Sequence, residues 1–195
     1  MTLSALGIFS AAGAGGVAAV PDYELISTNL ITTNTSSVTF DVSSLASTYK
    51  HLQIRATGRQ SASFVLLGVR MRLGSPSVDS GSNYAEHFLK GQNGSVTSYG
   101  GASISAFDVS YDTGASASAN IFGAAVIDIL DPFSTTKNTT VRSLAGVYAG
   151  TGTSHAVTLF SGHWRNTAAV QTIQLIPAGS NFVSGSRFSI YGIKG

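Results

Sequence analysis

Apolar and polar residues alternate with a period of two along most of the chain after residue 22. In residues 63–73 every second residue from Val65 to Leu73 is apolar, and the opposite face ends in Arg70 and Arg72. This alternation is typical of a β-strand with one buried face. We therefore expect a strand here whose apolar face lies deep in a core.

The last run of the chain repeats the pattern. Phe188 and Ile190 share one face, whereas Arg187 and Tyr191 lie on the other. A terminus normally frays unless a sheet holds it, so we expect this strand to complete the core. Because Tyr191 and Ile193 also carry apolar surface, the second face is expected to border an assembly interface.

Similar short runs, separated by turn residues, predict ten strands. They are expected at residues 23–31, 38–42, 52–57, 64–73, 104–111, 120–130, 140–148, 156–164, 172–176 and 187–193. The stretches 74–101 and 113–119 are rich in small and polar residues, which is typical of loops. Asn93 and Gly94 form a tight-turn pair. One helical turn is expected in each of residues 44–49 and 83–90.

Composition favours an all-β fold. Val, Ile, Thr, Phe and Tyr are frequent, whereas strong helix formers are scarce. No repeat has a fixed period and no linker separates two cores, so 195 residues fit a single domain. We predict a jelly-roll-like antiparallel β-sandwich at residues 23–195, preceded by an extended apolar N-terminal arm at residues 1–22.

The first 20 residues are small and apolar and contain no Lys or Arg. Without a basic n-region they differ from a signal peptide, and glycines at positions 7, 13, 15 and 16 make a poor membrane helix. We expect no membrane span. The arm is expected either to dock on a partner subunit or to cover its own sandwich.

Charged residues are scarce. They make up 10% of the chain, against about 25% in ordinary soluble domains, and the net charge is +2. A surface of hydroxyls and small apolar groups suits a protein that packs against neighbours. Lys and Arg are scattered, which argues against direct nucleic-acid binding. The absence of Cys excludes disulfides and thiolate metal sites.

The histidines, the acids and the glycine-rich segment of the chain do not form a pattern that predicts a catalytic or metal site. Residues 13–18 match a dinucleotide-binding fingerprint, but no clear strand precedes them and Pro21 ends any helix. His155 and His163 share a strand face, yet about 3.3 Å per residue separates them by about 26 Å. Asp131 precedes a proline and is expected to form a turn. With nine acids in all, a glycosidase pair is disfavoured. We expect no enzyme, metal or cofactor.

Two kinds of side chain are candidates for binding. Tyr84, Tyr99 and Trp164 are aromatic candidates for stacking on a glycan or packing at an interface, although a core or rim position is the simpler interpretation for Trp164. Arg187 and Lys194 bracket the final strand, and we expect them to pair with acids across a subunit boundary.

Several segments resemble a domain of virion proteins from tailed bacteriophages. They are VIDILDPF at residues 126–133, TKNTTVR at 136–142, SGHWRNT at 161–167 with Ile173 and Leu175 following, GSRFSIYGIK at 185–194, and the upstream residues 84–91. The resemblance covers residues 23–194. It implies a structural role in the virion, as a decoration, fibre or tail-associated subunit, and it offers no catalytic residues.

These observations predict a phage virion protein located in the virion. The favoured hypothesis is a capsid decoration, or cement, protein that assembles as a homotrimer and buries surface against the major capsid protein or another virion protein. The alternative is a tail-fibre or receptor-binding module that recognises a host surface glycan.

Overall fold

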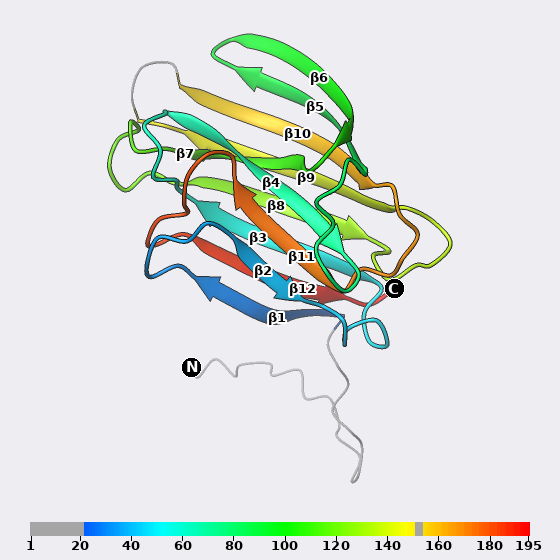
Figure 1. Ribbon diagram of the computed structural model, residues 1–195. Coiled ribbons are helices and arrows are strands. Elements are labelled where there is room, and N and C mark those ends of the chain that lie inside the picture. Colours follow the sequence, from blue (N-terminus) through cyan, green and yellow to red (C-terminus); the bar gives the residue numbers. More distant parts are fainter. Residues whose placement is uncertain (1–21, 151–153) are drawn as a thin grey trace, which may run out of the picture.

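The computed structural model describes residues 22–150 and 154–195, and these residues form two antiparallel β-sheets packed face to face (Figure 1). The larger sheet contains, in spatial order, β1 (Tyr23–Leu30), β12 (Arg187–Ile193), β3 (His51–Gly58), β8 (Gly123–Leu130), β9 (Thr139–Tyr148), β10 (His155–Trp164), β5 (Tyr84–Gln92) and β6 (Ser95–Ile104). The smaller sheet contains β2 (Val38–Asp41), β11 (Thr172–Pro177), β4 (Leu66–Gly74) and β7 (Phe107–Thr113).

The strand order is that of a jelly roll with two insertions. The four strands β1-β12-β3-β8 lie opposite β2-β11-β4-β7, and among these eight strands the chain changes sheet at every connection except that from β4 to β7, which are neighbours in the smaller sheet. The hairpin β5–β6 is inserted between β4 and β7, and β9–β10 is inserted between β8 and β11. Both hairpins extend the larger sheet. The predicted all-β, jelly-roll-like sandwich is therefore confirmed; its arm lies outside the described residues, apart from Asp22.

Alternating side chains fill the space between the sheets. Along β9 every second residue is buried, from Thr139 to Val147, while the residues between them are exposed. On β12, Phe188 and Ile190 are 0% and 1% exposed, and the strand lies between β1 and β3 rather than at an edge. The prediction that the last strand completes the core is confirmed.

The sequence-based prediction is wrong for residues 84–101. They were expected to form part of a loop and a helical turn, but they belong to the hairpin β5–β6. The hairpin was missed because both faces of β6 are exposed and its small, polar residues show no alternation. The tight-turn prediction is correct, since Asn93 and Gly94 join the two strands with φ angles of 52° and 79°. The strand expected at 104–111 begins later, at Phe107.

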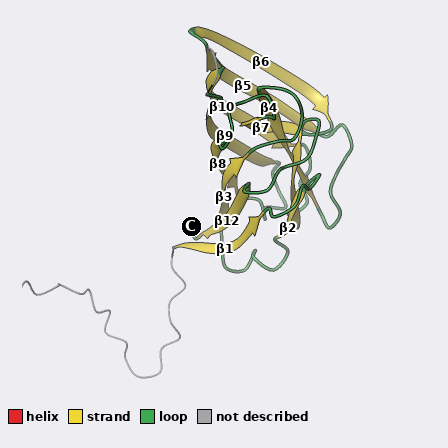
Figure 2. Ribbon diagram, turned by 90° about the vertical axis from the view of Figure 1, so that its left-hand side faces the viewer, coloured by secondary structure: helices red, strands yellow, loops and turns green. Residues whose placement is uncertain are grey.

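The hairpin β5–β6 overhangs the smaller sheet. Strand β7, at the edge of that sheet, packs against β8, β9 and β10 and also touches β5, whereas β6 extends past it (Figure 2). The inner face of β6 therefore lies beyond the edge of the smaller sheet. Within the described residues, no helix is long and apolar enough to cross a membrane.

Candidate functional site

The outer face of the larger sheet carries an apolar band. Val126, Leu144, Leu159 and Leu89 lie directly opposite one another on β8, β9, β10 and β5. In the next row, Val157 on β10 is followed by Gly91 and then Val96 on β6. We define the apolar band as Leu89, Val96, Val126, Leu144, Val157 and Leu159, whose exposed fractions run from 41% to 73%.

Glycines hollow the apolar band. Gly146 lies opposite both Ala124 and Val157, and a Cβ on it would meet no atom within 4 Å. A depression of about 490 Å³ lies here, lined by Val126, Leu144 and Val157 among others. A second, of about 670 Å³, continues towards Tyr148 and the loop before β8. The band is therefore a shallow apolar trough that crosses several strands.

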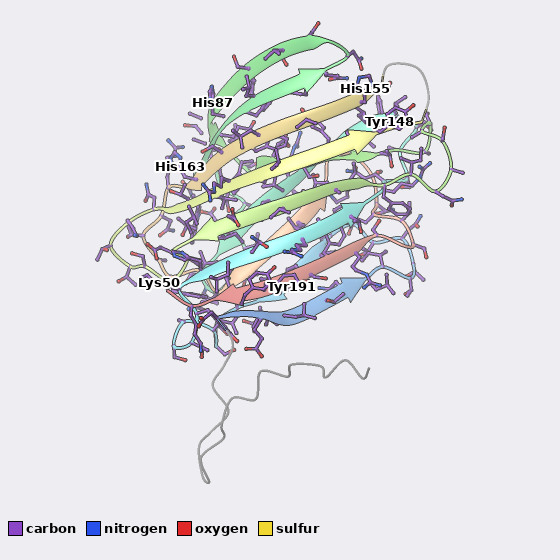
Figure 3. The ribbon with its side chains drawn as sticks, turned by 180° about the vertical axis from the view of Figure 1, so that it is seen from behind. Lys50, His87, Tyr148, His155, His163 and Tyr191 are labelled. Carbon is purple, nitrogen blue, oxygen red and sulfur yellow. The ribbon has the colours of Figure 1, made fainter. Side chains whose placement is uncertain are left out.

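Polar residues border the apolar band on one side. Arg142 Nε lies 3.2 Å from Asp128 Oδ2, and the same row continues with Ser161 and His87. Figure 3 looks onto this outer face, with His87 and His163 beside the band and Tyr148 and His155 at its far end. All six side chains of the apolar band therefore lie on the same side of this polar row.

Towards the other end of the sheet, aromatic rings and a guanidinium cover the outer face. The rings of Tyr23 and Tyr191 stack with centroids 4.8 Å apart. The guanidinium of Arg55 lies 5.6 Å and 5.4 Å from these two centroids. Tyr191 thus packs within its own chain on the face that the sequence predicted to border an interface.

A second candidate site lies under the overhanging hairpin. We call it the hairpin cleft. It has a volume of about 430 Å³ and is lined by Arg70, Ser82, Glu86, Tyr99, Ser103, Ile104, Ser105, Ala106 and Asp108. Arg70 comes from β4, Glu86 from β5, Tyr99 from β6 and Asp108 from β7, so four strands of both sheets build it.

Two carboxyl groups and one guanidinium meet in the hairpin cleft. The Asp108 backbone N–H donates to Glu86 Oε2 at 2.7 Å, and Arg70 Nε lies 3.4 Å from Asp108 Oδ1. Burial and, after it, the negative charge of Glu86 raise the pKa of Asp108 to about 6, although Arg70 opposes this rise. Asp108 therefore holds its proton more strongly than an exposed aspartate does.

Tyr99 forms one wall of the hairpin cleft. Its side chain is 53% exposed, and its ring packs against Phe88 with centroids 5.6 Å apart. Gly101 pairs with Glu86 in the sheet, and a Cβ on it would lie 3.3 Å from Tyr99 Oη and 3.7 Å from Glu86 Cγ. The side chains of Tyr99 and Glu86 therefore lie together over Gly101, where a larger residue would crowd the Tyr99 hydroxyl.

The other two aromatic candidates lie in the core. Tyr84 and Trp164 are 0% and 1% exposed, so neither ring offers a face to a glycan. The Tyr84 hydroxyl hydrogen-bonds with the Leu73 and Asp79 backbones, and Trp164 Nε1 donates to Asp79 Oδ2 at 2.8 Å. Together they anchor the loop between β4 and β5.

The charged candidates lie at the two ends of β12. The Arg187 side chain is exposed on the outer face. The Lys194 backbone N–H donates to Asp22 O at 3.1 Å, which ties the chain end to the residue before β1. Pairing of either side chain with acids of another subunit stays a prediction.

The prediction that Asp131 forms a turn is confirmed, since the Ser134 N–H donates to Asp131 O at 3.1 Å. Asp131 has a φ of 47° and pairs with Lys137 and with Lys50, whose Nζ lies 3.3 Å from Asp131 Oδ1. The hydrogen bond from Lys137 lowers the pKa of Asp131 most. Among the described residues, no three His, Cys, Asp or Glu side chains are grouped to hold a metal ion.

Most of the hairpin cleft was not predictable from the sequence. Tyr99 was a candidate for stacking on a glycan or packing at an interface, but Glu86 counted only among the nine acids and Arg70 only as part of the polar face of a strand. No sequence signal joins them, because the four cleft strands come together only through the sheet order.

Comparison with known proteins adds no identity. No protein-family model matches the chain, and no match was found among curated proteins or solved structures.

Proposed function

We propose that this chain is a structural subunit of a tailed-phage virion, a capsid decoration protein that assembles through its apolar band. The resemblance of residues 23–194 to phage virion proteins supports the virion role. The jelly-roll frame is compatible with it but is shared by many functions.

The apolar band is the observation that carries the assembly role. It groups six large apolar side chains on a chain in which only 10% of residues are charged. Contiguous exposed apolar surface of this kind marks protein–protein contact sites, because leaving it in water costs free energy that burial recovers. Two inserted hairpins supply most of the band, so the sandwich core does not require these residues.

In this proposal a second copy of the chain covers the apolar band, within a homotrimer. The major capsid protein or another virion protein binds the assembled oligomer. Co-sedimentation with purified phage particles tests the virion role, and a chain absent from intact particles would overturn it.

A double variant tests the role of the apolar band. Leu144→Glu combined with Leu159→Glu places two negative charges in the centre of the apolar band. Burial of the band against a neighbour would leave these charges without water or an ionic partner. We expect association to weaken about 100-fold, measured as the concentration dependence of mass by light scattering. Thr140→Glu, exposed on β9 in the row of His163, is the control and should keep the wild-type mass. An unchanged mass in the double variant would contradict the proposal.

A second candidate function is a receptor-binding module. The hairpin cleft favours it, because the exposed Tyr99 ring lies beside hydrogen-bonding groups in a hollow. In this reading the chain belongs to a tail fibre or tail tip and holds a host surface glycan.

A further inference from the structure

We propose that the hairpin cleft is a binding site for an uncharged sugar, with the Tyr99 ring as its stacking wall and Arg70, Glu86 and Asp108 as its hydrogen-bonding groups. The inference deepens the receptor-binding alternative and does not depend on the apolar band, which lies on the opposite face of the larger sheet.

The size and construction of the cleft suit a small ligand. A volume of about 430 Å³ lies within the range of small-molecule sites. Its four main side chains, those of Arg70, Glu86, Tyr99 and Asp108, project from β-strands, so they are positioned before a ligand arrives. The cleft lies where the hairpin β5–β6 extends past β7, an arrangement of strands that can be followed in Figure 2.

The polar groups of the cleft have unused hydrogen-bonding capacity. Glu86 Oε2 accepts the Asp108 N–H, and Asp108 Oδ1 faces Arg70. Among the described residues, the second oxygen of each carboxyl group has no hydrogen-bond partner, and neither oxygen is buried. Vicinal hydroxyls of a sugar donate to such oxygens, and Arg70 has further N–H groups to donate to ligand oxygens.

The charge pattern selects an uncharged ligand. The carboxyl groups of Glu86 and Asp108 would repel an anionic ligand, and the guanidinium of Arg70 would repel a cationic ligand. A neutral polyol satisfies donors and acceptors without adding charge. The hydroxyls of Ser82 and Ser105 offer the same two-way hydrogen bonding, and the Ser103 hydroxyl, which accepts from Arg165 Nη2 at 3.1 Å, can still donate.

The Tyr99 ring supplies the apolar part of the recognition. Phe88 supports it from the adjacent strand, and the hydroxyl end of the ring lies over Gly101, where a Cβ would be only 3.3 Å from Tyr99 Oη. A sugar has one apolar C–H face and a polar edge. Stacking that face on Tyr99 directs the hydroxyl edge towards Glu86.

Titration of the purified chain followed by NMR tests the site. The probes are D-glucose, D-galactose, D-mannose, L-rhamnose and N-acetyl-D-glucosamine, with N-acetylneuraminic acid as the anionic and spermidine as the cationic control. We expect saturable binding of at least one neutral sugar, with amide shifts at Glu86, Tyr99 and Asp108. No saturable binding by any neutral sugar, or binding of only the charged probes, would overturn the proposal.

Three variants and two controls locate the binding. Tyr99→Ala and Glu86→Gln should each weaken the bound sugar about tenfold, whereas Tyr99→Phe keeps the ring and should bind as wild type. Glu86→Gln retains an acceptor for the Asp108 N–H, so the fold should persist. Tyr148→Ala, on the outer face, should change nothing. Wild-type affinity in both Tyr99→Ala and Glu86→Gln would place the sugar elsewhere.

The double variant of Leu144 and Leu159 should bind sugar normally, which separates this test from that of assembly.

Discussion

Asp112 carries a carboxyl group that is buried in the protein, away from water. It is 2% exposed, and its Oδ2 atom is buried without a hydrogen-bond partner among the described residues. Burial raises its pKa to about 8, and an interaction with the Gln60 side chain opposes this only in part. It packs under Gly58, where a Cβ would lie 2.0 Å from Asp112 Oδ2. The folded chain therefore favours a protonated Asp112.

This burial makes stability depend on pH. In the folded state Asp112 keeps its proton up to about pH 8, whereas the ordinary pKa of the unfolded chain is 3.8. Its contribution to stability is therefore complete below pH 4 and lost as pH rises towards 8. Asp112→Asn stays neutral at every pH. We expect it to be more stable than wild type at pH 8 by about 1–3 kcal/mol, with the difference shrinking at pH 4.

Urea unfolding at pH 4, 6 and 8 measures this difference. Other titrating groups, including Asp108 with its raised pKa, are common to both chains and cancel in the comparison. Parallel stability curves for wild type and Asp112→Asn would show that Asp112 ionises normally.

At the scale of elements, the two inserted hairpins have different packing on their inner sides. Strand β7 covers the inner face of β9–β10, and Gly162 on β10 lies against the Phe107 ring. The inner face of β5–β6 carries the hairpin cleft instead. Both inserted hairpins thus contribute to the outer face of the larger sheet. Of the two, β5–β6 is the one whose inner face lines a cleft.

A matched pair of glycine variants tests this packing. A Cβ on Gly162 would lie 2.5 Å from Phe107 Cδ2, whereas a Cβ on Gly146 would meet nothing within 4 Å. We expect Gly162→Ala to lower the free energy of unfolding by about 1–3 kcal/mol through overpacking. Gly146→Ala, in the neighbouring strand, should be neutral or slightly stabilising. Equal urea midpoints for the two variants would contradict the close contact of β10 with β7.

The strands were predictable in proportion to how strongly one face is buried. β4 and β9 alternate visibly because the core covers one side of each, and β12 was predicted with its observed bounds. β6 was missed because its residues Ser95 to Ile104 are solvated on both sides, so no periodic pattern is required of them. Only its turn, Asn93–Gly94, carried a local signal.

At the scale of the whole molecule, charge is scarce and apolar surface is concentrated. The net charge of +2 gives little long-range repulsion between copies. The apolar band occupies one face and the hairpin cleft opens on the other side of the same sheet. The two proposed binding surfaces therefore lie on opposite sides of one sheet and do not overlap.

The salt dependence of association distinguishes apolar from ionic assembly. Burial of the apolar band should be unaffected by sodium chloride between 0.05 and 0.5 M, or slightly strengthened, because screening acts on charges and not on apolar burial. Analytical ultracentrifugation at several salt concentrations measures the association constant. A marked loss of association at high salt would show that scattered Lys and Arg residues hold the assembly instead.

The sequence by itself determined the all-β class, most strands and the final strand's place in the core, since burial of one face imposes a period of two on the residues. It also indicated a charge-poor surface suited to packing. Only the tertiary structure decided that Tyr84 and Trp164 are core anchors while Tyr99 is exposed. It alone aligned the apolar band and brought Arg70, Glu86 and Asp108 together, because strand order joins residues that no local pattern connects.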